Sequence, residues 1–297
     1  MSQQTHVITL ISHPDEGQIT DRTLNDLADH LGRKLDVRQL AEGVAFDIPV
    51  SEAEATHAAL VAPHLDQQRI DMAIQPIEGR QKSILIADMD STMIEQECID
   101  ELADAVGIKD KVSDITARAM RGEIEFDPAL RERVDLLKGL DLSIIDDVVR
   151  DKITLRTGGR ELVQTMKAKG GYTALVSGGF TMFTARIAEM LGFDENRANT
   201  LEVDGNQLSG TVADPILGSA AKVTALEEIC AMKGLAPSDV MAIGDGANDL
   251  GMIELAGSGI AVHAKPKVAA AADMAINHGD LTALLYLQGY SKADFIR

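Results

Sequence analysis

Aromatic residues are scarce in this sequence of 297 residues, which has 6 Phe, 3 Tyr and no Trp. A surface that stacks nucleobases needs aromatic side chains, so the composition argues against such a surface. Positive charge is also in short supply, because 28 Lys and Arg stand against 47 Asp and Glu, a formal net charge of −19. A chain this acidic is poorly suited to polyanions. We therefore expect no nucleic-acid partner, and a small anion must be bound by a few local cations.

Cysteines and long apolar runs are scarce too. The two cysteines, Cys98 and Cys230, have no Cys-x-x-Cys spacing and are interpreted as buried free thiols in a reducing compartment. No apolar run approaches the roughly 18 residues needed to cross a bilayer. The N-terminal MSQQTHVITL lacks the basic stretch and sustained apolar core of a signal peptide. These absences predict a cytoplasmic protein with no membrane partner.

Residues 1–79 alternate between strand and helix patterns. Strands are predicted for HVITLIS, KLDVRQL, VAFDIPV and RIDMAIQPI, and helices for DRTLNDLADHLG and EAEATHAALVAPHL. The resulting β-α-β-β-α-β order is that of the ferredoxin-like α+β fold. A polar stretch, EGRQKS at 78–83, is predicted to link this domain to the next.

From residue 84 the pattern becomes that of a parallel sheet covered on both faces. ILIAD, GYTALVSGG, VMAIGDG and GIAVHA are nearly continuous apolar runs separated by helical segments. They predict a doubly wound α/β domain over 80–297. Residues 92–152 are almost wholly helical in pattern, so a helical insertion of about 93–152 is expected. LEVDGNQLSGTV is predicted to be a hairpin that turns at Asp204-Gly205.

Carboxylates follow two of the predicted strands. Asp88 and Asp90 close the run ILIADMD, and Asp245 and Asp249 lie in GDGANDLG. Parallel strand ends meet in one crevice, where these groups would repel one another unless a hard cation lay among them. Oxygen ligands with no nearby histidine or cysteine favour Mg²⁺ over zinc. We therefore predict a magnesium site; for an isolated Asp-x-Asp the alternative is a solvated loop.

A second set of residues suits an anion. Ser177 ends an apolar run, and Gly178 and Gly179 allow backbone N–H groups to approach a ligand at the start of the next helix. Lys222 heads the helix KVTALEEICAMKG, where a cation opposes the helix dipole. We interpret Lys222 as offsetting a bound phosphate and the carboxylates; an exposed lysine is the alternative.

Together, the two sets indicate phosphoryl transfer, which needs charge neutralisation and in-line positioning. Asp88 would attack phosphorus and form an aspartyl-phosphate. Asp90 would protonate the departing alkoxide and then activate water.

These motifs, DMDST, SGG, Lys222 and GDGAND in that order, resemble the four motifs of the haloacid-dehalogenase-like phosphatases. The predicted insertion resembles that superfamily's small helical cap. Across 84–280 the chain is also similar to the phosphoserine phosphatase family, through DMDSTMIEQECIDELA and TARAMRGEIEFDPALRERVDLLKG. The resemblance implies Mg²⁺-dependent hydrolysis of O-phospho-L-serine to L-serine and phosphate, the last step of serine biosynthesis.

The resemblance implies roles in the α/β domain residue by residue. Asp88 matches the nucleophile and Asp90 the acid/base. Mg²⁺ would be held by the Asp88 carboxylate, the Asp90 backbone carbonyl and Asp245. Asp249 would support the metal and phosphate region. The implied phosphate-binding and neighbouring residues are Ser177, Gly178, Lys222 and Asn248.

In the cap, Glu97 matches the residue that faces the substrate ammonium, and Arg133 the one that pairs with its carboxylate. Met120 and Phe126 match residues that close over the site. Arg grips a carboxylate in a bidentate manner, so these types suit phosphoserine. Without the family, Glu97 could cap helix charges beside a predicted capping box in TMIE, 92–95, and Arg133 could be one of several exposed charges.

The first domain resembles the ACT-type small-molecule-sensing module. HPDEGQIT resembles the Pro-Asp-x-x-Gly turn where such domains bind amino acids, although Gly17 comes one residue early. A spacer or a dimerisation domain, and hence a homodimer, is the alternative to an amino-acid site. For the whole chain, the alternatives to hydrolysis of phosphoserine are transfer of the phosphoryl group to a second alcohol, hydrolysis of another small phosphorylated metabolite, and a non-catalytic amino-acid sensor.

Overall fold

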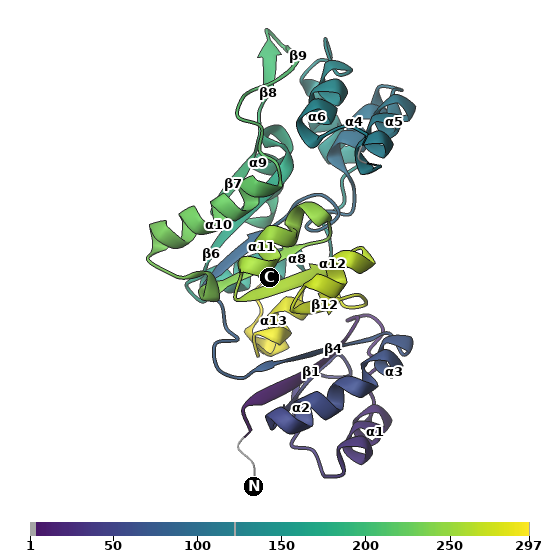
Figure 1. The fold of residues 1–297 in the computed structure, drawn as a ribbon, viewed down its shortest axis with the longest axis vertical. Helices are drawn as coiled ribbons and strands as arrows, with labels where there is room; N and C mark the ends of the chain where they lie inside the picture. The colour runs from purple at the N-terminus through teal and green to yellow at the C-terminus, as the bar shows by residue number, and fades with distance from the viewer. Residues whose placement is uncertain (1–3, 122, 297) are drawn as a thin grey trace.

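The computed structural model describes residues 4–121 and 123–296, apart from the side chain of Met120. Figure 1 shows an N-terminal α+β unit at one end, an α/β core in the middle, and a group of helices with a hairpin at the other end. Within the described residues, no helix is both long and apolar enough to cross a membrane.

The N-terminal unit has the predicted β-α-β-β-α-β order, with its second helix in two pieces. Its elements are β1 (His6–Ser12), α1 (Asp21–Leu31), β2 (Arg38–Ala41), β3 (Ala45–Val50), α2 (Glu52–Ala58), α3 (Ala62–Gln67) and β4 (Ile70–Pro76). The sheet order is β2-β3-β1-β4. The second helix is divided because Pro63 occupies the first turn of α3, where its missing N–H is tolerated.

The core is a six-stranded parallel sheet of order β12-β11-β10-β5-β6-β7, so the predicted doubly wound fold is confirmed. Its strands are β5 (Ile84–Ala87), β6 (Tyr172–Phe180), β7 (Glu195–Asn199), β10 (Val240–Gly244), β11 (Ser258–Val262) and β12 (Met274–Ile276). The helices around the sheet are α8 (Gly159–Ala168), α9 (Thr181–Leu191), α10 (Ser219–Lys233), α11 (Leu250–Leu255), α12 (Pro266–Ala271) and α13 (Ala283–Leu287).

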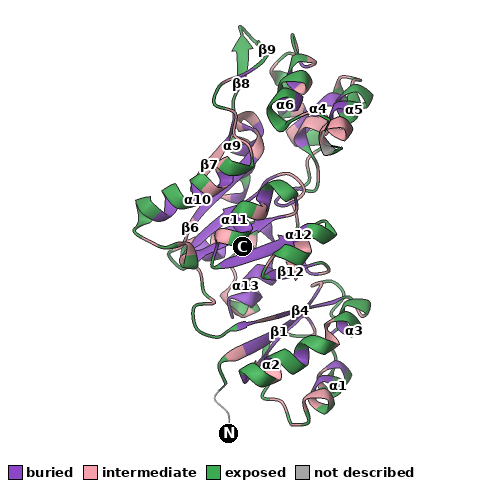
Figure 2. Ribbon diagram, in the orientation of Figure 1, coloured by how far each residue is buried: buried purple, intermediate pink, exposed green. Residues whose placement is uncertain are grey.

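Both faces of this sheet are covered, as the continuous apolar runs predict. Ile86 of β5 joins a buried cluster with Leu226 of α10, while its neighbour Leu85 joins another with Leu162 of α8. Figure 2 shows the central strands buried beneath helices with exposed outer surfaces. The sheet is therefore a rigid support for residues at its strand ends.

The helical group inserted between β5 and β6, called the cap, consists of α4 (Cys98–Ala105), α5 (Lys109–Met120), α6 (Phe126–Asp135) and α7 (Ser143–Asp151). The hairpin of β8 (Leu201–Asp204) and β9 (Gln207–Val212) lies beside it (Figure 1), and Gly139 donates its N–H to Leu208 O at 2.8 Å. The hairpin turns at Gly205-Asn206, one residue later than predicted.

The cap begins later than the helical pattern suggests. Residues 91–97 form turns and a bridge, in which Ile94 pairs with Leu155, and α4 starts only at Cys98. The predicted capping box at 92–95 is therefore wrong. The Thr92 hydroxyl donates instead to Asp245 Oδ1 at 3.3 Å, a partner 153 residues away that local periodicity could not reveal.

The N-terminal unit is joined to the core by the buried carboxylate of Asp71 on β4. Its oxygens accept backbone N–H groups from Asn277, His278 and Gly279, at 2.8 to 3.3 Å, just after β12. Gln75 Nε2 also donates to Leu287 O at 2.7 Å. The domain boundary after residue 79 stays a prediction.

Candidate active site

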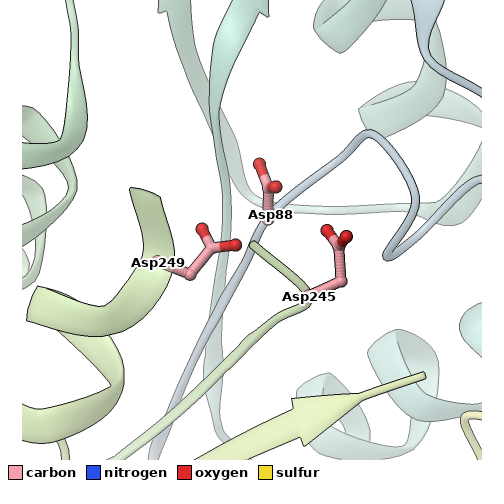
Figure 3. Close-up of side chains that lie close together, drawn as sticks. All are labelled: Asp88, Asp245 and Asp249. Atoms are coloured by element: carbon pink, nitrogen blue, oxygen red, sulfur yellow. The ribbon is translucent and has the colours of Figure 1, made fainter. Parts of the chain in front are cut away.

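Three aspartates from separate segments converge at the carboxyl ends of the core strands (Figure 3). Asp88 follows β5, Asp245 follows β10, and Asp249 ends the short helical turn that comes next. One carboxylate oxygen of each lies within 4.8 Å of the others. Strands β5 and β10 are paired with Ala87 beside Ile243, so the residues that follow them emerge at one level. The topology thus brings together carboxylates that are far apart in sequence.

Lys222 lies beneath this cluster. Its Nζ is 2.6 Å from Asp88 Oδ1 and 2.5 Å from Asp249 Oδ1, and only 2% of its side chain is exposed. Burial opposes its charge, but the carboxylates of Asp88 and Asp249 outweigh burial and raise the pKa of Lys222. Burial in turn raises the pKa of Asp88, against the attraction of Lys222. The alternative of an exposed lysine is wrong: Lys222 neutralises the cluster from within.

The three carboxylates fit a hard divalent cation. Only oxygen atoms are offered, with no histidine or cysteine in this group of described residues. Burial, and then the negative charge of Asp249, raise the pKa of Asp245. A bound cation would relieve this repulsion between the two carboxylates. Asp249 is already engaged, because Oδ1 pairs with Lys222 and Oδ2 accepts the Gly246 N–H at 3.0 Å. Asp88 and Asp245 are therefore the better placed ligands, and Asp249 fits a supporting position.

Asp90 lies apart from that cluster, at the base of the cap. Its Oδ1 accepts the backbone N–H of Cys98, the first residue of α4, at 2.9 Å. Burial raises the pKa of Asp90, and the Cys98 N–H opposes the shift. A raised pKa keeps a carboxyl group protonated closer to neutral pH, which suits a proton donor.

Ser177, Gly178 and Gly179 form a bulge near the end of β6 that faces Asp90 across the crevice. Ser177 Oγ accepts the N–H of Gly179 at 2.9 Å. A Cβ on Gly179 would lie 3.0 Å from Asp90 Oδ2 and 3.1 Å from Ser177 Oγ. A side chain at this position would be crowded by both groups, and glycine leaves room for the Ser177 hydroxyl and the Asp90 carboxylate.

The cap supplies the opposite wall. Ser91 Oγ donates to Glu97 Oε1 at 2.8 Å, while burial, and then Asp90, raise the pKa of Glu97 to about 7. Arg133 on α6 donates Nε to Ala129 O at 3.2 Å and is half-buried, and this burial lowers its pKa. Arg133 is therefore not one of a row of freely exposed charges. Glu97 is the N-cap residue of α4 and its side chain makes no capping hydrogen bond, so the helix-charge interpretation is supported only by its place at the helix end.

A cavity of about 680 Å³ joins the two walls. Among the residues that line it are Asp88, Asp90, Glu97, Phe126, Arg133, Ser177, Gly178, Asp245 and Asn248. Phe126 reaches from the cap to the core, since Cβ atoms on Gly178 and Gly218 would lie 3.6 and 3.4 Å from its ring. Met120 ends α5, and its predicted contact with substrate lies outside the described side chains.

Among the lining residues that the sequence analysis missed are two charged ones, Lys265 and Asp100. Lys265 lies at the end of the loop that follows β11, and its N–H donates to Asp245 O at 3.3 Å. The strand-end rule that identified Asp245 could have found it. Asp100 lies one helical turn after Glu97 on α4, and i, i+3 spacing from Glu97 was the available signal.

A family model, curated sequences and solved structures all show similarity to the haloacid dehalogenase-like hydrolases or to phosphoserine phosphatases. The family model described as haloacid dehalogenase-like hydrolase matches residues 85–254. A phosphoserine phosphatase of Streptomyces coelicolor is 37% identical over 295 residues, 97% of this chain and 71% of that protein. A phosphoserine phosphatase of Archaeoglobus fulgidus is 44% identical over 217 residues, which are 72% of this chain. The match spans 63% of the length of that protein.

Two solved structures extend the likeness to the fold. A probable phosphoserine phosphatase of Vibrio cholerae in unliganded form has a TM-score of 0.82 at 29% identity, covering 99% of this chain and 90% of that one. A structure named as a phospho-aspartyl intermediate analogue of phosphoserine phosphatase has a TM-score of 0.64 at 38% identity, covering 69% of this chain and 98% of that one. The N-terminal unit therefore has a counterpart in the first of these structures.

Proposed function

The chain belongs to the haloacid dehalogenase-like hydrolases, as a phosphatase related to the phosphoserine phosphatases, and we propose that it hydrolyses O-phospho-L-serine to L-serine and phosphate with Mg²⁺ bound. One observation carries this proposal. Asp88, which pairs with the buried Lys222, lines a cavity whose other wall holds Glu97 and Arg133.

The two walls match the two ends of the substrate. Phosphoserine carries a phosphate at one end and an ammonium and a carboxylate at the other. Ser177 and Gly178 suit the phosphate, and the buried Lys222 beside Asp88 is the cation near it. An Arg133 guanidinium suits the carboxylate, and an ionised Glu97 suits the ammonium. A ligand that spans the cavity would place its ester bond near Asp88 and Asp90.

The reaction follows from the positions of these two aspartates. An oxygen of Asp88 attacks phosphorus, the ester bond between phosphorus and the serine oxygen breaks, and Asp90 gives its proton to that oxygen. Water then attacks the aspartyl-phosphate, Asp90 takes the proton from the water, and the Asp88 carboxylate and phosphate are released. Mg²⁺ held by Asp88, the Asp90 carbonyl and Asp245 would supply charge neutralisation for the phosphoryl group.

A phosphate-release screen tests this function. Phosphorylated metabolites are offered to the protein in Mg²⁺ and then in excess EDTA. We expect release from phosphoserine with Mg²⁺ and its loss with EDTA, restored by added Mg²⁺. Added alcohols, such as homoserine, test the transfer alternative, because a phosphorylated alcohol would be the product. Preferred release from an unrelated phosphate ester would contradict the proposed substrate.

The position in serine biosynthesis, the cytoplasmic location and a homodimer rest on the resemblance and on the absences in the sequence. The ACT-like assignment rests on the predicted fold order and the HPDEGQIT turn. In the structure this turn lies against Gly43, since the N–H of Ile19 donates to Gly43 O at 3.0 Å. Glu16 of the turn pairs with Arg69 at 3.0 Å, so part of its polar surface is already occupied.

A further inference from the structure

Asn199, the last residue of β7, ties together two loops of the phosphate side of the cavity. It is 2% exposed. Its Nδ2 donates to Gly178 O at 2.9 Å and to Leu217 O at 3.1 Å, and its Oδ1 accepts the N–H of Leu217 at 2.7 Å. A buried amide whose hydrogen bonds are satisfied in this way fixes the spacing of the groups it joins.

The first of these loops is a bulge in the sheet. Strands β6 and β7 pair in register up to Val176 beside Arg197, and pairing resumes at Phe180 beside Asn199. Strand β6 thus advances four residues while β7 advances two, so Ser177, Gly178 and Gly179 project out of the ladder. The Asn199 side chain bonds the Gly178 carbonyl at the point where the regular ladder is interrupted.

Holding that carbonyl also sets the direction of the Ser177 hydroxyl. In a trans peptide the C=O of Gly178 and the N–H of Gly179 point to opposite sides. The Gly179 N–H is therefore directed away from Asn199, and it donates to Ser177 Oγ at 2.9 Å. Because Oγ accepts this bond, its own hydrogen is available for another acceptor, such as a phosphate oxygen.

The second loop leads to Lys222. Leu217 precedes Gly218, the N-cap of α10, and Lys222 is the fourth residue of that helix. The two loops approach closely, since a Cβ on Gly178 would lie 3.9 Å from Leu217 O. One amide side chain therefore sets the separation between a hydroxyl on one loop and the helix that carries the ammonium.

We propose that Asn199 is a positioning residue for the phosphoryl group, acting through Gly178 and Leu217 to hold Ser177 and Lys222 at a fixed separation. The inference rests on the proposed function for its choice of ligand. It does not require Asn199 to touch the substrate.

The test compares Asn199→Asp and Asn199→Ala with a control on the same strand. Asn199→Asp keeps the size and the acceptor for Leu217 N–H but places a second acceptor against two carbonyls. Asn199→Ala removes all three bonds without that repulsion. The control is Asn196→Ala, whose Oδ1 accepts the Thr184 hydroxyl at 2.8 Å, a contact with α9 rather than with either loop.

Binding of inorganic phosphate is measured by calorimetry with Mg²⁺ present, and inhibition by L-serine is measured separately. We expect both Asn199 variants to bind phosphate at least about tenfold more weakly, because hydrogen bonds that orient its donors are lost. L-serine lacks a phosphate and is expected to contact only the cap wall, so its inhibition constant should change by less than about twofold. Asn196→Ala, which removes one hydrogen bond, should lower the melting temperature by less than Asn199→Ala and leave phosphate affinity unchanged.

Unchanged phosphate affinity in the Asn199 variants would overturn the inference, as would equal weakening in Asn196→Ala. Failure of both Asn199 variants to fold would also overturn it, by assigning Asn199 to stability alone. These outcomes differ from failure of the proposed function, which would be the absence of phosphoserine hydrolysis by the unaltered protein.

Discussion

The Lys222 ammonium and the Asp88 carboxylate form an ion pair at 2.6 Å, in which 2% and 6% of the two side chains are exposed. Two buried charges at this distance depend on each other, because each loses its hydration and is compensated mainly by its partner. The pair is completed by Asp249, which contacts the same ammonium. Because Lys222 has two carboxylate partners, loss of the Asp88 carboxylate is expected to affect the reaction more than the stability of the fold.

Asp88→Asn should abolish turnover and leave the fold intact. The amide cannot attack phosphorus, so kcat should fall by at least about 10³-fold. Lys222 keeps Asp249 as its partner, so the melting temperature should change little. Asp204→Asn, an exposed change in the hairpin, is the control for loss of one carboxylate. Full phosphate release by Asp88→Asn would show that Asp88 is not the nucleophile.

The activity on phosphoserine should rise with pH through neutrality because of Glu97. Its pKa is raised to about 7, so the side chain is protonated and neutral below that pH and ionised above it. Only the ionised form can pair with the substrate ammonium. We expect kcat/KM for phosphoserine to show a step near pH 7 that is absent for an aryl phosphate. Glu97→Gln should remove the step, and a step of equal size in that variant would assign it to another group.

Arg133→Ala should raise KM for phosphoserine far more than for a simple aryl phosphate. The guanidinium is expected to bind the substrate carboxylate, which an aryl phosphate lacks. A loss of about tenfold to a hundredfold in kcat/KM is expected for a charged hydrogen bond. The matched control is Arg131→Ala on the same helix, whose arginine pairs with Asp214 at 2.5 Å on the exposed side. Equal effects on both substrates would show that Arg133 does not bind the carboxylate.

Asp71→Ala should destabilise the protein without removing any active-site group. The variant leaves three backbone N–H groups near the end of β12 without their charged acceptor, so a loss of about 3 kcal/mol in unfolding free energy is expected. Asp66→Ala is the control, because Asp66 pairs with His278 at an exposed position, and it should cost less than about 1 kcal/mol. Urea unfolding measures both. A similar loss in the two variants would contradict the role given to Asp71.

The strand ends could be predicted because parallel strands share a direction. An apolar run followed by Asp88, Ser177 or Asp245 was enough to place those residues at one edge of the sheet. The same rule did not identify Asn199, because the segment ENRAN is polar and does not show the apolar run that predicts a buried strand. The burial of Lys222 was equally unpredictable, because it depends on how α10 packs in the fold and no short sequence motif indicates that packing.

Local periodicity failed where distant partners decide the structure. The segment 92–97 reads as helix, but Glu95 donates its N–H to Thr154 O, and Arg156 donates to the carbonyls of Ser91 and Thr92 at 2.8 and 3.0 Å. These bonds link the two chain segments that enter and leave the cap. The turn that results holds Ser91 at a positive φ of 55°, which no helical pattern accommodates.

The hydrogen bond from the Cys98 N–H ties Asp90, the acid/base of the proposed mechanism, to the first helix of the cap rather than to the core. A displacement of α4 relative to the core would therefore lengthen or break this bond. In the proposed mechanism, the orientation of the Asp90 carboxyl group is thus coupled to the position of the cap.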